Sequence, residues 1–86
     1  MRRVLYLVTG SRPLEEDPLF VPTQESGDES EVVLIQDAVR LTRVPISRVS
    51  VLDEDFRGQA GQSLFPIITY GDLIERIFSA DAVIRI

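Results

Sequence analysis

Hydrophobic residues occur along this chain in short runs that polar or turn-forming residues separate. Residues 4–9 form a continuous apolar run with β-branched and aromatic members, which is typical of a strand covered on both faces. Later runs have the same length and character. The pattern therefore predicts five strands, at residues 4–9, 31–36, 46–52, 66–70 and 82–86.

Short helices are predicted between these strands. Asp is favoured where a helix starts, so we interpret Asp37 and Asp53 as caps of helices that follow the second and third strands. Pro45 ends the first of these helices, because the residue before a proline avoids helical backbone angles. The other predicted helices are a single turn that begins at Pro13, and a longer helix from Asp72 with Leu73, Ile74, Ile77 and Phe78 at helical spacing.

The alternation of strands and short helices predicts an α/β fold with a mainly parallel sheet. We find no internal repeat, and the length of 86 residues predicts one domain over residues 1–86. Residues 20–30 show no usable period and contain an acidic cluster, so we interpret them as a long acidic loop. A domain this short has a marginal core, which a partner subunit often supplements.

The residue types that the chain lacks limit its chemistry. There is no His, Cys or Lys, so a Ser–His–Asp triad, a thiol nucleophile and a Schiff base are excluded. The Gly-rich stretch at residues 57–61 lacks the lysine of a phosphate loop and follows no strand directly. We therefore predict no intrinsic catalytic activity and no cofactor.

Charge and hydropathy limit the partners. The net charge of −5 and the pI near 4.5 disfavour direct binding to nucleic acid, because phosphate backbones repel an acidic chain. All nine cations are Arg, which suits protein interfaces, although a codon bias toward Arg explains the same composition. No apolar stretch is long enough to span a membrane, and we predict a cytoplasmic protein.

Polar residues that follow the second and third strands are the candidate site. Ligands of open α/β sheets bind outside the carboxyl ends of the strands, where Gln36 and Asp37 follow one strand and Asp53 follows the next. Two loop phenylalanines are either core residues or exposed anchors for a partner. The predicted interface or pocket residues are thus Gln36, Asp37, Asp53, Phe20 and Phe65.

The same carboxylates support an alternative hypothesis. Asp37, Asp53 and Asp55 could together bind Mg²⁺, as acidic clusters do in phosphoryl-transfer domains. Helix capping by Asp37 and Asp53 is the simpler interpretation, and it needs no metal.

Three segments in order resemble a known family. They are VVLIQDAV at 32–39, VSVLDEDFRGQAG at 49–61 and ITYGDLIERI at 68–77. Together they resemble the DsrH/TusB-like proteins, small members of the DsrE/DsrF/DsrH sulfur-relay group. The resemblance implies a three-layer α/β/α sandwich around a largely parallel five-stranded sheet. It also implies assembly with DsrE-like and DsrF-like (TusD and TusC type) subunits.

The family passes persulfide sulfur toward 2-thiouridine at the tRNA wobble position or serves sulfur oxidation. Some members carry a cysteine in the segment after the first strand, whereas residues 10–30 of this chain contain none. The resemblance therefore implies a non-catalytic relay subunit without its own sulfur carrier. The alternative is a self-associating α/β module with a binding or regulatory role, because short domains often become stable as homo-oligomers.

Overall fold

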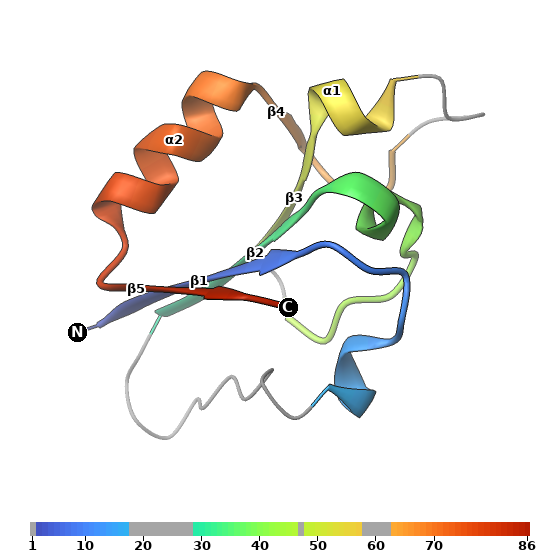
Figure 1. The fold of residues 1–86 in the computed structure, drawn as a ribbon, viewed down its shortest axis with the longest axis horizontal. Helices are drawn as coiled ribbons and strands as arrows, with labels where there is room; N and C mark the ends of the chain where they lie inside the picture. Colours follow the sequence, from blue (N-terminus) through green and yellow to red (C-terminus); the bar gives the residue numbers. More distant parts are fainter. Residues whose placement is uncertain (1, 18–28, 47, 58–62) are drawn as a thin grey trace.

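The computed structural model describes residues 2–17, 29–46, 48–57 and 63–86. These residues form a five-stranded, all-parallel sheet in the order β4-β3-β2-β1-β5 (Figure 1). The strands are β1 (Arg3–Val8), β2 (Glu29–Leu34), β3 (Val49–Leu52), β4 (Ile67–Ile68) and β5 (Ala82–Arg85).

In the described residues, four helical segments lie between the strands. Two are 3₁₀ helices, η1 (Leu14–Glu16) and η2 (Gln36–Arg40), and two are α-helices, α1 (Asp53–Phe56) and α2 (Tyr70–Ser79). The chain advances across the sheet from β1 to β4, and α2 then returns it to β5 at the opposite edge. Helical segments lie on both faces of the sheet (Figure 1). The predicted three-layer α/β fold around a parallel five-stranded sheet is confirmed.

Side chains of the sheet alternate between two hydrophobic cores. Tyr6 and its β1 neighbours Val4 and Val8 pack on one face, in a cluster that includes Leu14 of η1 and Val39 of η2. The other face carries a smaller cluster, which α2 covers. Its buried members are Leu5, Val33, Leu52, Ile68 and Leu73. Among the described elements, α2 is the only helix on that face.

The start of α2 corrects the prediction of the fourth strand. The predicted strand runs to Tyr70, whereas β4 ends at Ile68 and Tyr70 is the first residue of α2. The reason is a capping box: the Thr69 hydroxyl accepts from the backbone N–H of Asp72, whose carboxylate accepts from the N–H of Thr69. These two bonds satisfy amides at the helix start and begin the helix early.

The apolar residues of α2 do not form one buried face. Leu73 is buried and Ile77 packs against it, whereas Ile74 is 38% exposed and Phe78 is 85% exposed. The helical spacing was therefore predicted correctly, but only half of these residues contact the sheet. Within the described residues, no helix is long and apolar enough to cross a bilayer.

Candidate functional site

Gln36 and Asp37, which follow β2, and Asp53, which follows β3, lie at the carboxyl edge of the sheet. Gln36 begins η2 directly after β2, with a backbone φ of 52°. Its backbone N–H donates to Oδ2 of Asp55 in α1 at 2.8 Å. The side chains of Gln36 and Asp37 are exposed. A hydrogen bond from a backbone amide to a carboxylate therefore connects the segments that follow β2 and β3 at this edge.

The prediction that Asp37 and Asp53 cap their helices is wrong. The cap positions are Ile35 for η2 and Leu52 for α1, and neither helix has a side-chain cap bond. Each helix starts earlier than predicted, so Asp37 and Asp53 lie inside the first turn. Asp53 instead pairs with Arg57 at 3.1 Å, one turn later in the chain. The acidic side chains still favour a helix start through the helix dipole.

The three carboxylates do not form a metal site in the described part of the chain. No group of three or more carboxylates there is arranged to hold an ion. Asp55 accepts from the Gln36 amide and Asp53 pairs with Arg57. Both carboxylates therefore already have partners within the protein. The arrangement does not favour the carboxylate–metal alternative.

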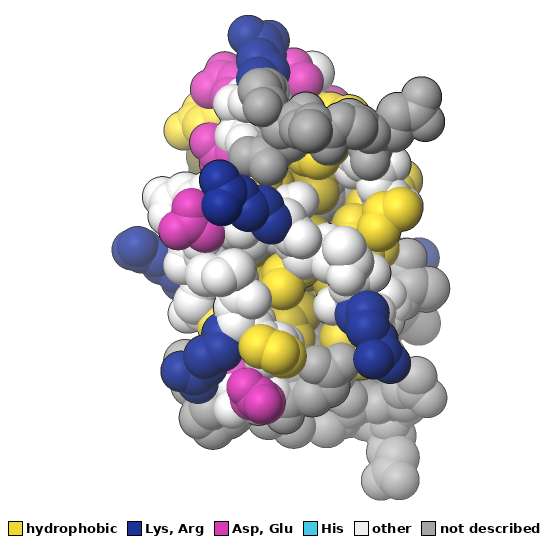
Figure 2. Space-filling model, turned by 90° about the vertical axis from the view of Figure 1, so that its right-hand side faces the viewer, with side chains coloured by type: hydrophobic (Ala, Val, Ile, Leu, Met, Phe, Trp, Pro, Cys, Tyr) yellow, Lys and Arg dark blue, Asp and Glu magenta, His cyan; other side chains and the backbone are white. Residues whose placement is uncertain are grey.

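Of the two predicted phenylalanines, the structure describes only Phe65. Phe65 is partly buried against the larger core, and its loop is closed by Ser63, whose hydroxyl donates to the Phe65 carbonyl oxygen at 2.7 Å. It is therefore a core residue rather than an exposed anchor. Phe20 lies outside the described residues. The carboxyl side of the sheet, seen in Figure 2, shows Arg and acidic side chains scattered among apolar ones, without one dominant charge.

A second polar cluster lies on the α2 face, toward the opposite end of the strands. A pocket of about 330 Å³ opens there between α2 and the starts of β1 and β2. A neighbouring hollow of about 360 Å³ extends over β3 and β4. Both are lined by Glu31, Arg48 and Arg76. We call these two hollows and their lining residues the Arg76 groove.

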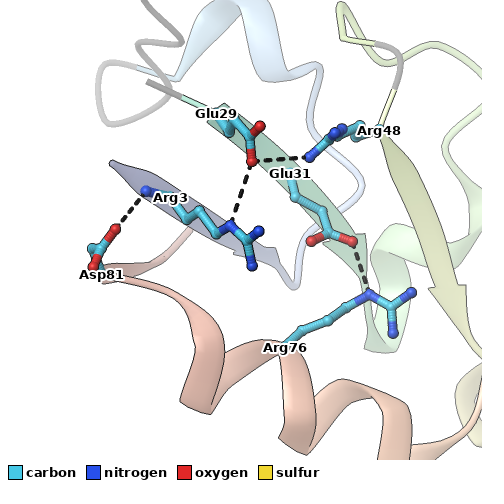
Figure 3. Close-up of polar contacts among 6 residues, drawn as sticks. All are labelled: Arg3, Glu29, Glu31, Arg48, Arg76 and Asp81. Carbon is cyan, nitrogen blue, oxygen red and sulfur yellow. Dashed lines mark hydrogen bonds and ion pairs between the residues drawn. The ribbon is translucent and has the colours of Figure 1, made fainter. Parts of the chain in front are cut away.

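Ion pairs cross the mouth of this groove (Figure 3). Glu29 forms an ion pair with Arg3 at 3.4 Å and accepts a hydrogen bond from Arg48 at 3.3 Å. In Arg76, Nε donates to Oε2 of Glu31 at 2.8 Å. The pairs of Glu29 involve Arg side chains that are more than 60% exposed, so each contributes at most about 1 kcal/mol to stability.

The helix that carries Arg76 is held by its own capping box. The pKa of Asp72 lies below its ordinary value, mainly because the Thr69 backbone N–H donates to its carboxylate. A hydrogen bond with the Thr69 hydroxyl lowers the pKa further, and the positive charge of Arg76 adds a smaller effect. Arg76 also donates from its terminal nitrogen to the Asp72 carbonyl oxygen at 3.2 Å. These contacts orient the Arg76 side chain toward the groove.

The charged side chains of the groove are binding groups. Its guanidinium groups are positive and its carboxylate groups are negative, so it suits a partner surface that also carries charges of both signs. Ser50 at its base is buried and lies on the α2 face, in register with Val33. The sequence prediction missed this groove. The signal in the sequence is the charged residues at or just before the starts of three neighbouring strands, namely Arg3, Glu29 and Arg48.

Comparison of the chain with family models, with curated proteins and with solved structures finds no match.

Proposed function

We propose that this chain is a non-catalytic subunit of a sulfur-relay complex, acting in the cytoplasm in tRNA wobble-uridine 2-thiolation or in sulfur oxidation. Its partners are DsrE-like and DsrF-like chains. The support for these partners is the order of the three resembling segments at 32–39, 49–61 and 68–77. The absence of cysteine from the chain assigns the sulfur-carrying thiolate to a partner.

The Arg76 groove is the observation that supports a binding role. It gathers three of the nine Arg residues of the chain on one face. Arg is enriched at protein interfaces, because its planar guanidinium is weakly hydrated and forms forked contacts with carboxylates. The side chains of Arg3 and Arg48 are 64% and 61% exposed, so both can exchange their internal partner for a carboxylate of another chain.

The hollow over β3 and β4 is the second support. Only α2 covers this face among the described elements, and the hollow beside it is lined by Pro66 and by the buried residues Ser50 and Ile68. A partner segment seated here would extend the cover over β3 and β4. A mixed apolar and charged surface of this kind matches the core and rim of a stable interface.

Co-expression with the DsrE-like and DsrF-like proteins of the same genome tests the proposal. We expect one complex of defined stoichiometry in size-exclusion chromatography with light scattering. The Arg48→Glu variant reverses a charge at the groove and should release the chain from that complex. Its ion pair with Glu29 is exposed, so its thermal unfolding should change little.

The matched control is Arg43→Glu, which makes the same charge change at an exposed residue outside the groove. It should leave the complex intact. If the unmodified chain elutes without either partner, the relay proposal is wrong. If both variants bind equally well, the groove is not the docking surface.

A further inference from the structure

One side of α2 carries a row of exposed apolar residues. Tyr70, Ile74 and Phe78 follow one another at intervals of four residues and are 54%, 38% and 85% exposed. Successive residues of a helix turn by about 100°, so this row lies on the flank opposite Arg76. We call it the apolar flank of α2. Arg76 reaches β2, and the apolar flank therefore faces the β5 side of the sheet.

The edge strand beside this flank adds another apolar side chain. Val83 of β5 is in register with Leu5 of β1, which belongs to the core beneath α2. Partners in a parallel register point to the same face, so Val83 lies on the α2 face. It is 43% exposed. The apolar flank and Val83 thus share one side of the molecule.

The outer edge of β5 can accept another strand. β5 ends the sheet and pairs only with β1 among the described strands. Ile86, just beyond β5, exchanges backbone hydrogen bonds with Leu7 and Thr9 of the β1 side. Because backbone groups alternate in direction along a strand, those of Val83 and Arg85 point away from β1. The other edge strand, β4, has only two residues and follows Pro66, which makes it a poor pairing edge.

The opposite charges on the two sides of Val83 make the edge of β5 complementary to the same edge of a second copy. Asp81 lies just before β5, where its Oδ2 accepts from the backbone N–H of Arg3 at 2.7 Å. Arg85 lies in β5, two residues after Val83 and on the same face of the strand. Asp81 and Arg85 are both exposed. They are about 13 Å apart along the extended chain, too far to pair with each other. In an antiparallel pairing centred on Val83, Asp81 of each strand faces Arg85 of the other.

From this geometry we propose that a second copy of the chain docks across the outer edge of β5 and forms a two-fold dimer. The two sheets become continuous, and the symmetry gives two Asp81–Arg85 contacts between copies. Parallel pairing in register would place like charges opposite each other instead. The inference does not depend on the proposed function, because the Arg76 groove lies on the other flank of α2.

The apolar flanks of the two helices meet above the joined strands. Each α2 contacts β1, so at least three strand spacings of about 4.8 Å separate the two helices. That distance exceeds the 8–10 Å of direct helix packing, and long side chains are needed to fill it. Phe78 and Tyr70 have the required reach, and Val83 with its symmetry mate forms the base.

Sedimentation equilibrium of the full chain, from low micromolar to roughly millimolar concentration, tests the dimer. We expect a monomer–dimer equilibrium for the unmodified chain. Arg85→Asp or Asp81→Arg each replaces both attractive contacts by repulsion and should raise the dissociation constant by about tenfold to a hundredfold. Phe78→Ser should raise it by at least about tenfold.

Mixing the two charge variants gives the decisive result. Each alone should be largely monomeric, whereas their equimolar mixture should form a heterodimer, because the two contacts then join opposite charges. Circular dichroism establishes that both variants are folded. Arg43→Asp is the control for a charge change elsewhere and should not affect the dimer.

Several outcomes would overturn the inference. A chain that stays monomeric at roughly millimolar concentration has no such dimer. A dimer that is unaffected by Arg85→Asp and Phe78→Ser uses another surface. A mixture of the two charge variants that does not associate contradicts the antiparallel register. Arg48→Glu should leave the dimer intact, which separates this test from that of the relay complex.

Discussion

The backbone N–H of Gln36 donates to Oδ2 of Asp55 at 2.8 Å, across 19 residues of sequence. The first amides of a helix have no partner within the helix, and here a carboxylate from α1 satisfies the amide at the start of η2. The contact connects the two helical segments that follow β2 and β3. It explains why Asp37 is not needed as a cap.

Removal of this carboxylate should destabilise the domain. We expect Asp55→Ala to lower the free energy of unfolding by about 0.5–2 kcal/mol, because the Gln36 amide loses its charged acceptor. Asp55→Asn keeps an acceptor oxygen, so it should lower the free energy of unfolding by less. Urea denaturation monitored by circular dichroism measures both. Glu54→Ala, an exposed neighbour in α1, is the control, and an equal loss there would contradict the assigned role of Asp55.

The backbone of Gln36 provides a second prediction. Its φ of 52° lies in the left-handed region, which costs a residue with a Cβ about 1 kcal/mol relative to Gly. Gln36→Gly should therefore raise the free energy of unfolding by up to about 1 kcal/mol, seen as a higher Tm. Asp37→Gly, at the next exposed position of η2, should lower it by about the same amount. A loss of stability in Gln36→Gly would show that its side chain matters.

The capping box of α2 predicts a pH dependence. The pKa of Asp72 lies below its ordinary value of 3.8, so the folded state favours the ionised carboxylate. The contribution of this carboxylate to folding stability is fully present above the ordinary pKa. It is lost as the pH falls through the lower pKa of the folded state. The stability difference between the unmodified chain and Asp72→Asn should be constant near neutral pH and should shrink below about pH 4.

Two variants complete this test. Thr69→Ala removes the hydroxyl that accepts from Asp72 and should cost about 1 kcal/mol at neutral pH. Glu75→Gln, at an exposed position of the same helix, is the control for the loss of one negative charge. A difference between the unmodified chain and Asp72→Asn that grows toward acid pH would contradict the direction of the pKa shift.

The ion pairs should differ in strength according to their exposure. Arg76 and Glu31 are 33% and 30% exposed, whereas Arg57 and Asp53 are 73% and 39% exposed. A double-mutant cycle with Arg76→Met and Glu31→Gln should give a coupling of about 0.5–1 kcal/mol after allowance for solvent screening. The cycle for Arg57 and Asp53 should give about 0.3–0.5 kcal/mol and a stronger salt dependence.

The sheet was predicted from local patterns because each strand has its own apolar run. Residues 4–9 became β1 with a shift of one residue, and the buried run at 31–36 became β2, which is displaced by two. The ends were less accurate where a specific contact decides them. Thr69 and Asp72 carry a recognisable capping signature in the sequence, and the apolar run 66–70 obscured it.

The sequence predicted that Gln36 and Asp53 follow neighbouring strands, but it did not predict the contacts of this edge. Gln36 and Asp53 lie at the ends of neighbouring strands, as the parallel sheet requires. The hydrogen bond from the Gln36 amide goes to Asp55 rather than to Asp37. Which carboxylate meets which amide depends on how the two connections pack, and no local pattern encodes that packing.

Two properties of this protein follow from the sequence alone: the α/β class, because alternating runs determine it, and the absence of thiol and imidazole chemistry, because the residues are missing. Only the tertiary structure decided which charges meet and which apolar side chains stay exposed. Arg76 pairs with Glu31 across 45 residues of sequence, and Phe78 is 85% exposed although it belongs to the same predicted apolar set of the helix as the buried Leu73. Burial depends on the direction from which the sheet approaches a helix, and that direction is set by the whole fold.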